Sequence, residues 1–333
     1  MNYDAARVLG GDQRAISRLM TMLERRDPSA AFAMKELDAY TGRAYTIGIT
    51  GPPGVGKSTL VDRFTEHLRN LDLTVGIIAV DPDSPYTGGA ILGDRIRMQR
   101  HFLDPSVYIR SVSTRGQSGG LPRIVKSLVR LLDAAGMDVI LVETVGVGQT
   151  ELGIMNVADT VIVALMPESG DSIQTLKAGV LEIADIFLVN KADREGADRM
   201  AAAMRAMLHT VSEPADWQPT VLLTQADRGA GIPELWEAVS SHRSYMNDSA
   251  QCGGFSPVDD RRSERRRQEF LESLQEELNQ LVKTQIENNP TLQSMLDDVA
   301  NGKLEPYSAA VELLKDGAPL RFRFLTDQEV SPA

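Results

Sequence analysis

The sequence predicts a doubly wound α/β fold with a mainly parallel, seven-stranded sheet and helical extensions at both ends. Seven short apolar segments alternate with amphipathic stretches between residues 44 and 246. Most of these segments are continuously apolar, as expected of strands that are buried on both faces of a parallel sheet. The chain has 333 residues, which is enough for one large α/β domain with appendages.

Helical spacing begins near the N-terminus and predicts helices within residues 4–38. The apolar positions that carry this spacing are Ile16, Leu19, Met20 and Leu23. The seven expected strands follow, joined by right-handed crossovers. These strands are expected at residues 44–50, 73–80, 106–112, 137–143, 159–166, 184–190 and 219–224.

The C-terminal region shows a different pattern. After a connector rich in Gly, Ser and Asp, a long helical pattern runs until Pro290, which is expected to end the helix. Two shorter helical stretches are expected up to about residue 316. Either the chain's own domain or a dimer partner covers the apolar stripe on the long helix, formed by Phe270, Leu274, Leu278, Leu281, Val282 and Ile286. We therefore expect three parts, at residues 1–42, 43–247 and 248–333.

Composition narrows the functional classes. The formal net charge of -11 argues against general attraction to nucleic acid or to an anionic membrane. The basic run RRSERRR at 261–267 is flanked by acidic residues and is expected to be a solvated helix face. The single cysteine, Cys252, excludes an internal disulfide and fits a reducing compartment. No signal-peptide core or membrane-length apolar stretch is evident, so we expect a cytoplasmic protein with no nucleic-acid or membrane partner.

The segment GPPGVGKST, residues 51–59, fits the pattern G-x-x-x-x-G-K-[ST] between an expected strand and an expected helix. Its glycines allow successive backbone N–H groups to point at phosphate oxygens, and the helix that follows adds the positive end of its dipole. Lys57 is expected to reach the β- and γ-phosphates, and Ser58 to offer its hydroxyl to Mg²⁺. The expected phosphate-binding residues are Gly51, Pro52, Pro53, Gly54, Val55, Gly56, Lys57, Ser58 and Thr59.

The segment NKAD, residues 190–193, directly follows an expected strand and predicts that the base is guanine. Asp193 can accept hydrogen bonds from the ring N–H and the exocyclic amine of guanine, whereas adenine offers neither donor there. Asn190 is expected to brace the loop and contact the base, and the stem of Lys191 to cover its face. Gln225 and Ala226 are expected near the guanine oxygen. This contact supports guanine less strongly than NKAD does, because Gln225 stands where a serine is often found.

Three acidic residues are expected at the phosphate end of the sheet. Asp81 and Glu143 end their strands, and Asp94 precedes a basic helix start. Each carboxylate could simply cap a helix or turn, but three of them beside the phosphate loop favour a Mg²⁺ site. The backbone N–H of Gly146 is expected to contact the γ-phosphate, and the candidate catalytic residues are Lys57, Asp94 and Glu143. The four histidines are scattered and predict no second metal centre.

Five segments together resemble the MeaB/ArgK-type P-loop GTPases over nearly the full chain. They are GPPGVGKST, DPDSPYTGGAILGDRIRM, ETVGVGQTE, MPESGDSIQTLKAG and NKAD. The resemblance implies a GTPase chaperone of an adenosylcobalamin-dependent acyl-CoA mutase, usually methylmalonyl-CoA mutase, that gates cofactor loading and protects the mutase from inactivation. It also implies GTP or GDP and Mg²⁺ as ligands, a homodimer formed through the C-terminal arm, and a third switch at Asp171, Gln174 and Lys177.

Two other functions share parts of this pattern. A nickel-insertion GTPase would share the fold and the NKxD segment, but such proteins usually carry Cys and His ligands near the nucleotide. A kinase or transport ATPase would bind ATP, whose adenine offers no hydrogen-bond donors to Asp193. No residue that positions the attacking water is identifiable, so turnover is expected to be slow until a partner supplies or orders such a group.

Overall fold

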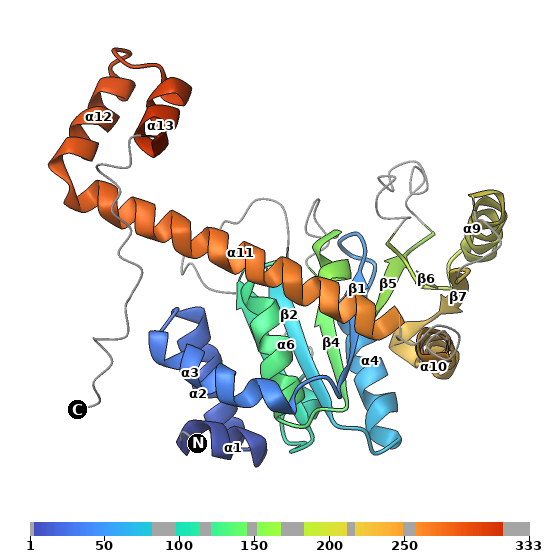
Figure 1. Ribbon diagram of the computed structural model, residues 1–333. Helices are drawn as coiled ribbons and strands as arrows, with labels where there is room; N and C mark the ends of the chain where they lie inside the picture. Colours follow the sequence, from blue (N-terminus) through green and yellow to red (C-terminus); the bar gives the residue numbers. More distant parts are fainter. Residues whose placement is uncertain are drawn as a thin grey trace. The chain divides into compact units, whose positions relative to one another are not determined.

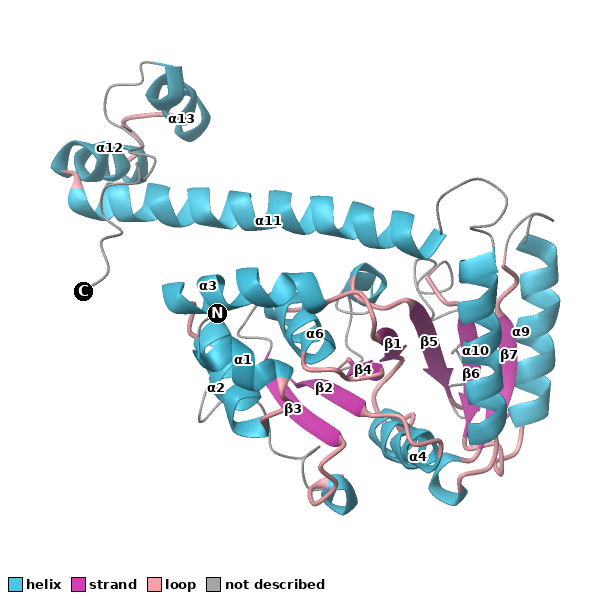
Figure 2. Cartoon of the chain, turned by 60° about the horizontal axis from the view of Figure 1, so that its bottom comes forward, coloured by secondary structure: helices cyan, strands magenta, loops and turns pink. Residues whose placement is uncertain are grey.

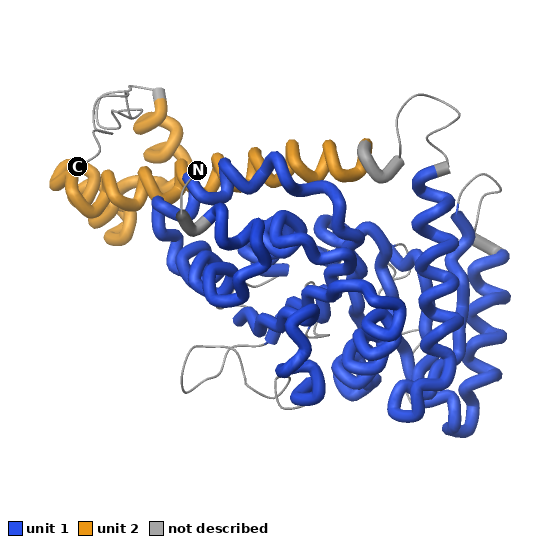
Figure 3. The backbone as a smooth tube through the Cα atoms, turned by 90° about the horizontal axis from the view of Figure 1, so that it is seen from below, with its two compact units in different colours: residues 1–258 blue, residues 259–333 orange. Residues whose placement is uncertain are grey.

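The computed structural model describes residues 3–81, 98–113, 121–144, 152–167, 183–211, 217–248 and 257–315. These residues divide into two compact units, residues 1–258 and 259–333 (Figure 3). The first unit contains the N-terminal helices together with the sheet. The boundaries at 42/43 and 247/248 that the sequence suggests remain predictions.

A single seven-stranded sheet forms the centre of the first unit (Figure 1). Its strands lie in the order β3-β2-β4-β1-β5-β6-β7, and every neighbouring pair is parallel. Their bounds confirm all seven expected strands: β1 Tyr45–Thr50, β2 Val75–Asp81, β3 Val107–Ser113, β4 Val139–Glu143, β5 Thr160–Leu165, β6 Ile186–Asn190 and β7 Thr220–Thr224. The chain order therefore reverses beside β1, which is where such sheets bind ligands.

The burial of each strand follows its place in the sheet. All residues of β1, β2, β4, β5 and β6 are buried, whereas the edge strands β3 and β7 are only partly so. A strand that is covered on both faces needs apolar side chains on both. The continuous apolar runs in the sequence thus have the expected cause.

Helices cover both faces of the sheet, as a doubly wound fold requires (Figure 2). One apolar core joins the sheet to the N-terminal helices, to α6 (Ile124–Ala134) and to α9 (Ala197–Val211). A second core joins the opposite face to α4 (Lys57–Asn70) and α10 (Ile232–Asp248). Short 3-10 turns complete these layers: η1 Asp38–Tyr40, η2 Gln99–His101, η4 Leu152–Asn156 and η5 Ala226–Arg228.

The N-terminal extension forms α1 (Tyr3–Leu9), α2 (Gln13–Glu24) and α3 (Pro28–Leu37), which confirms helices in this region. Asp12 caps α2 by accepting hydrogen bonds from two backbone N–H groups, which helices leave unpaired at their start. The side chains expected on the apolar side of α2 are buried or packed against the core: Ile16, Leu19, Met20 and Leu23. Arg110 on β3 forms a two-pronged ion pair with Glu24 and so fixes α2 to the edge of the sheet.

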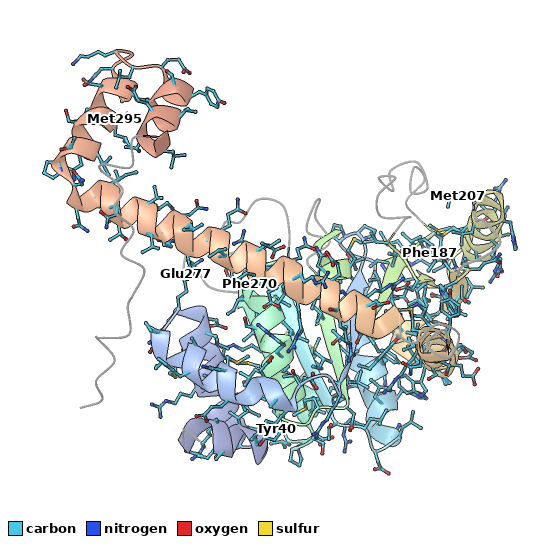
Figure 4. All side chains as sticks on the ribbon, in the orientation of Figure 1. Tyr40, Phe187, Met207, Phe270, Glu277 and Met295 are labelled. Atoms are coloured by element: carbon cyan, nitrogen blue, oxygen red, sulfur yellow. The ribbon has the colours of Figure 1, made fainter. Side chains whose placement is uncertain are left out.

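The second unit contains α11 (Pro257–Asn288) from Asp259 onward, α12 (Pro290–Ala300) and α13 (Pro306–Lys315). As expected, the long helix ends before Pro290, and two shorter helices follow. Phe270 on α11 has 66% of its surface exposed, in contrast to the buried Phe187 of the sheet (Figure 4). The stripe includes further exposed residues on α11: Leu274, Leu278 and Leu281. No helix in the part of the chain that the structure describes is long and apolar enough to cross a bilayer.

Candidate functional site

The loop at residues 51–56 joins β1 to α4 and has the backbone of a phosphate-binding loop. Gly51 and Gly56 have φ angles of 141° and 96°, and residues other than glycine rarely adopt such angles. A Cβ atom at Gly51 would lie 2.1 Å from the carbonyl oxygen of Ala164, and one at Gly56 would lie 2.7 Å from Nδ2 of Asn190. Glycine is therefore required at both positions, because neighbouring groups approach the loop closely.

Lys57 and Ser58 begin α4 directly after this loop, and both are buried. The ammonium group of Lys57 donates to the carbonyl oxygens of Gly51 and Pro52, at 2.8 and 3.2 Å. Its charge therefore lies against the loop, together with the positive end of the α4 dipole. Ser58 Oγ donates to Oε1 of Glu143 at 2.8 Å.

Asp81 and Glu143 lie at the carboxyl ends of adjacent strands. β2 pairs with β4 with Ala79 opposite Glu143, so Asp81 ends its strand just beyond that point. Both residues are buried, and Glu143 contacts the start of α4 through Ser58. Carboxylate and hydroxyl oxygens are suitable ligands for Mg²⁺, which usually binds one or two protein groups together with phosphate and water. The described ranges contain no group of three or more His, Cys, Asp or Glu residues that could hold a metal by itself.

Asn190 connects three parts of the site. Its Nδ2 donates to the carbonyl oxygen of Val55 in the phosphate loop at 2.8 Å. Its Oδ1 accepts from the backbone N–H of Ala226 at 3.1 Å and from the hydroxyl of Thr224 at 3.2 Å. One buried amide thus joins the end of β6, the end of β7 and the phosphate loop. Sequence reasoning assigned the bracing role to Asn190 but did not identify Thr224.

The next residue, Lys191, has a φ angle of 58° and so adopts a left-handed conformation. This conformation is uncommon outside glycine and is concentrated at functional sites. It turns the chain out of β6, and the Lys191 ammonium donates to the carbonyl oxygen of Gly54 at 2.7 Å. Asp193, two residues further on, is exposed to solvent.

The loop at residues 225–229 follows β7, and we call it the guanine loop after the role that the sequence predicts for it. Gln225 donates its backbone N–H to the carbonyl oxygen of Ala230 at 3.0 Å, which closes the loop. Ala226 is buried, and Gly229 has a φ angle of 74°. From α4, Arg63 Nη2 donates to the carbonyl oxygen of Asp227 at 2.9 Å, a contact that sequence reasoning missed. No spacing rule links a helix arginine to a loop 164 residues later.

The structure therefore brings the phosphate loop, Asp81, Glu143 and the NKAD segment to one edge of the sheet. Gln225 and Ala226 lie at the same edge through the contacts of Asn190 and Thr224. Five predicted residues lie outside the described ranges, so their roles stay predictions: Asp94, Gly146, Asp171, Gln174 and Lys177. Cys252 also lies outside those ranges.

Comparisons with known proteins show what the whole chain is similar to. A family profile described as methylmalonyl Co-A mutase-associated GTPase MeaB matches residues 16–287. A protein of Pyrococcus horikoshii named as a GTPase is 44% identical over 308 residues, which cover 91% of this chain and 94% of that protein. The mitochondrial methylmalonic aciduria type A homolog of Mus musculus is 32% identical over 275 residues, covering 81% of this chain and 65% of that protein. A crystal structure of an LAO/AO transport system kinase has a TM-score of 0.66 at 26% identity and covers 95% of this chain and 98% of that one.

Proposed function

Because the chain belongs to the family of methylmalonyl Co-A mutase-associated GTPases MeaB, we propose that it hydrolyses GTP with Mg²⁺ as a chaperone of an adenosylcobalamin-dependent acyl-CoA mutase. Methylmalonyl-CoA mutase is the first client to test. The observation that carries the nucleotide part is the side chain of Asn190, which joins the phosphate loop to the two loops that would hold a base.

In this proposal the two ends of the site do separate work. Lys57 and the backbone N–H groups of the phosphate loop bind the β- and γ-phosphates. Ser58 and Glu143, already in contact, would hold Mg²⁺ with Asp81 and Asp94, and the metal would neutralise charge that develops on the phosphates. At the other end Asp193 accepts from guanine, while Lys191 and the guanine loop hold the ring in place.

The chaperone part depends on the family description and on the mouse relative, whose name refers to methylmalonic aciduria. We propose that GTP binding and hydrolysis gate cofactor loading and protect the mutase from inactivation. The exposed apolar stripe of α11 supports a homodimer through the C-terminal arm, because stripes of this kind are usually covered by a partner. A cytoplasmic location is proposed for the same complex.

One experiment tests the enzyme and chaperone parts together. Phosphate release is measured with GTP and with ATP, each with and without methylmalonyl-CoA mutase, and binding of the mutase is followed by sedimentation of the same samples. We expect slow GTP hydrolysis, no comparable use of ATP, and at least about 10-fold stimulation by the mutase, because a partner then supplies or orders the group that positions water.

Each other outcome has a defined meaning. Preference for ATP would overturn the guanine assignment and favour a kinase or transport ATPase, as the name of the similar crystal structure suggests. Unchanged GTP turnover with a mutase that demonstrably binds would overturn the chaperone mechanism. Tight stoichiometric binding of Ni²⁺ in a titration would favour a metal-insertion GTPase instead. A monomer in sedimentation would overturn the homodimer.

A further inference from the structure

Charged side chains on α4 connect the guanine loop to η2, and the roles described above do not use them. The set consists of Asp62, Arg63 and Glu66 on α4 together with Arg100 and His101 in η2. α4 is also the helix that begins with Lys57 and Ser58. We call this set the α4 network.

The network contacts the guanine loop through Arg63. One end of the Arg63 guanidinium donates to the carbonyl oxygen of Asp227, and the other donates to Oε2 of Glu66 at 2.9 Å. Asp227 directly follows Ala226, whose N–H binds Asn190. The guanine loop is thus held at two consecutive residues, at Ala226 by Asn190 and at Asp227 by Arg63.

The same carboxylate of Glu66 also accepts from Arg100. Arg100 Nη1 lies 3.1 Å from Glu66 Oε2, and its Nη2 lies 3.2 Å from Oδ2 of Asp62. The hydrogen bond from Arg63 is the main cause that holds the pKa of Glu66 below its ordinary value, with the charge of Arg100 adding to it. Glu66 is therefore charged at neutral pH and joins the two arginines.

At the η2 end the network becomes buried. His101 Nε2 lies 3.1 Å from the carbonyl oxygen and 3.2 Å from Oδ1 of Asp62, and both side chains are only 7% exposed. Met98, just before η2, is fully buried in the core that also contains α4. Asp62 lies one helical turn after Ser58, so η2 is anchored to the part of α4 that follows the phosphate loop.

We propose that Arg63, Glu66 and Arg100 are positioning residues for guanine-nucleotide binding, which fix the guanine loop and η2 on the helix that carries Lys57 and Ser58. This inference rests on the proposed guanine-nucleotide site. Arginine suits the role, because its planar guanidinium reaches two acceptors at once, whereas lysine offers a single charged centre. Isolated exposed ion pairs contribute little to stability. Any effect of these residues on nucleotide binding must therefore come from fixing the guanine loop.

The test measures the dissociation constant and dissociation rate of GDP, kcat and KM for GTP, and thermal unfolding of Arg63→Met. A matched control is Arg205→Met, because Arg205 on α9 also donates through Nη2 to a backbone carbonyl, that of Val221 in β7, at 2.8 Å. We expect Arg63→Met to raise the GDP dissociation constant about 5-fold, the net size expected for one ordinary hydrogen bond, and Arg205→Met to change it less than about 2-fold. KM should rise with kcat nearly unchanged, because uniform binding is lost.

A mutant cycle tests whether the residues act as one network. Arg63 and Arg100 meet only at Glu66 among the contacts given above, so the effects of Arg63→Met and Arg100→Met on GDP affinity should be non-additive. In the Glu66→Gln background this non-additivity should disappear. Arg63→Lys should recover less than half of the lost affinity.

The outcomes separate this inference from the proposed function. Failure of the unaltered protein to bind GDP would contradict the proposed function itself. If the unaltered protein binds GDP and Arg63→Met weakens binding no more than Arg205→Met does, the positioning role is wrong. Additive effects of Arg63→Met and Arg100→Met would show two local contacts in place of a network and would overturn the shared role of Glu66.

Discussion

Carboxylates occupy both edges of the parallel sheet, but they have different partners at each. At the amino edge they accept hydrogen bonds from backbone N–H groups at strand starts. Asp133 accepts from three successive residues, 42 to 44, and single N–H groups are bound by Asp138, Asp159 and Asp185. At the carboxyl edge Glu143 instead accepts from the side chain of Ser58, and Asp193 is exposed. The edge of the sheet, and not the residue type, thus indicates whether a carboxylate supports the fold or is available to a ligand.

Positive φ angles occur at both edges of the sheet and do not distinguish them. Gly51, Gly56 and Lys191 have them at the carboxyl edge, and Gly42, Asp72 and Gly136, which precede β1, β2 and β4, have them at the amino edge. The edges differ in what the polar side chains bind. Aspartates at the amino edge bind the N–H groups of strand starts, whereas Lys57 and Glu143 at the carboxyl edge lie at the phosphate loop and the start of α4. Substitutions at the carboxyl edge should therefore impair ligand binding with little loss of stability, and substitutions at the amino edge should do the reverse.

The largest expected effect is at Lys57. Lys57→Met removes the ammonium group at the phosphate loop, so we expect GTP affinity and hydrolysis to fall about 10³-fold, or about 4 kcal/mol. The thermal midpoint should change by less than about 3 °C, because the methionine stem fills a similar space. Nucleotide titration and calorimetry on the same preparation check both statements. A folded variant that retains normal GTP affinity would break the distinction between the edges.

The converse change is at Asp133. Asp133→Ala leaves the N–H groups of residues 42–44 without their acceptor, and we expect the free energy of unfolding to fall by about 3 kcal/mol. Asp133→Asn keeps one acceptor oxygen and should lose less. Denaturant unfolding measures the loss, and the GDP affinity of the folded fraction should stay within about 2-fold. Weakened GDP binding without a loss of stability would contradict the assignment.

The sequence predicts the fold well, because its strongest patterns are local. Continuous apolar runs identify all seven strands, and the run GPPGVGKST identifies the phosphate loop from nine adjacent residues. Asp159 and Asp185 stand at the starts of apolar runs, and nothing in the sequence distinguishes them there from ordinary loop residues. Only the register of the finished sheet shows that each accepts from a neighbouring strand.

The contacts that were not predicted are those between distant segments. Arg63 and Asp227 are 164 residues apart, and Thr224 at the end of β7 contacts Asn190 at the end of the neighbouring strand β6. Neither pair has a spacing that a helix or strand period would reveal. Periodicity reports which face of an element a residue occupies, whereas such contacts depend on how the strands are ordered. The strand order 3-2-4-1-5-6-7 is therefore the information that the sequence patterns lack.

The smallest expected effect belongs to the amino edge and appears only at alkaline pH. Burial of Tyr45, with smaller effects from its neighbours, raises its pKa to about 12, and its hydroxyl lies 2.6 Å from Thr160 Oγ1, which in turn contacts His242. The unfolded chain releases this proton at about pH 10, whereas the folded chain retains it, so stability is complete below pH 10 and falls as the pH rises toward 12. The loss should amount to about 2–3 kcal/mol.

Unfolding curves between pH 9 and 12 measure this loss as a difference between the unaltered chain and Tyr45→Phe. The variant lacks the titrating hydroxyl, so its stability should fall less steeply, although it starts lower because the bond to Thr160 is lost. Tyr40→Phe is the control, since Tyr40 is 37% exposed and should leave the slope unchanged. Equal slopes for all three chains would show that the buried hydroxyl of Tyr45 ionises as freely as in the unfolded state. The predicted loss of stability at alkaline pH would then have no source at the amino edge.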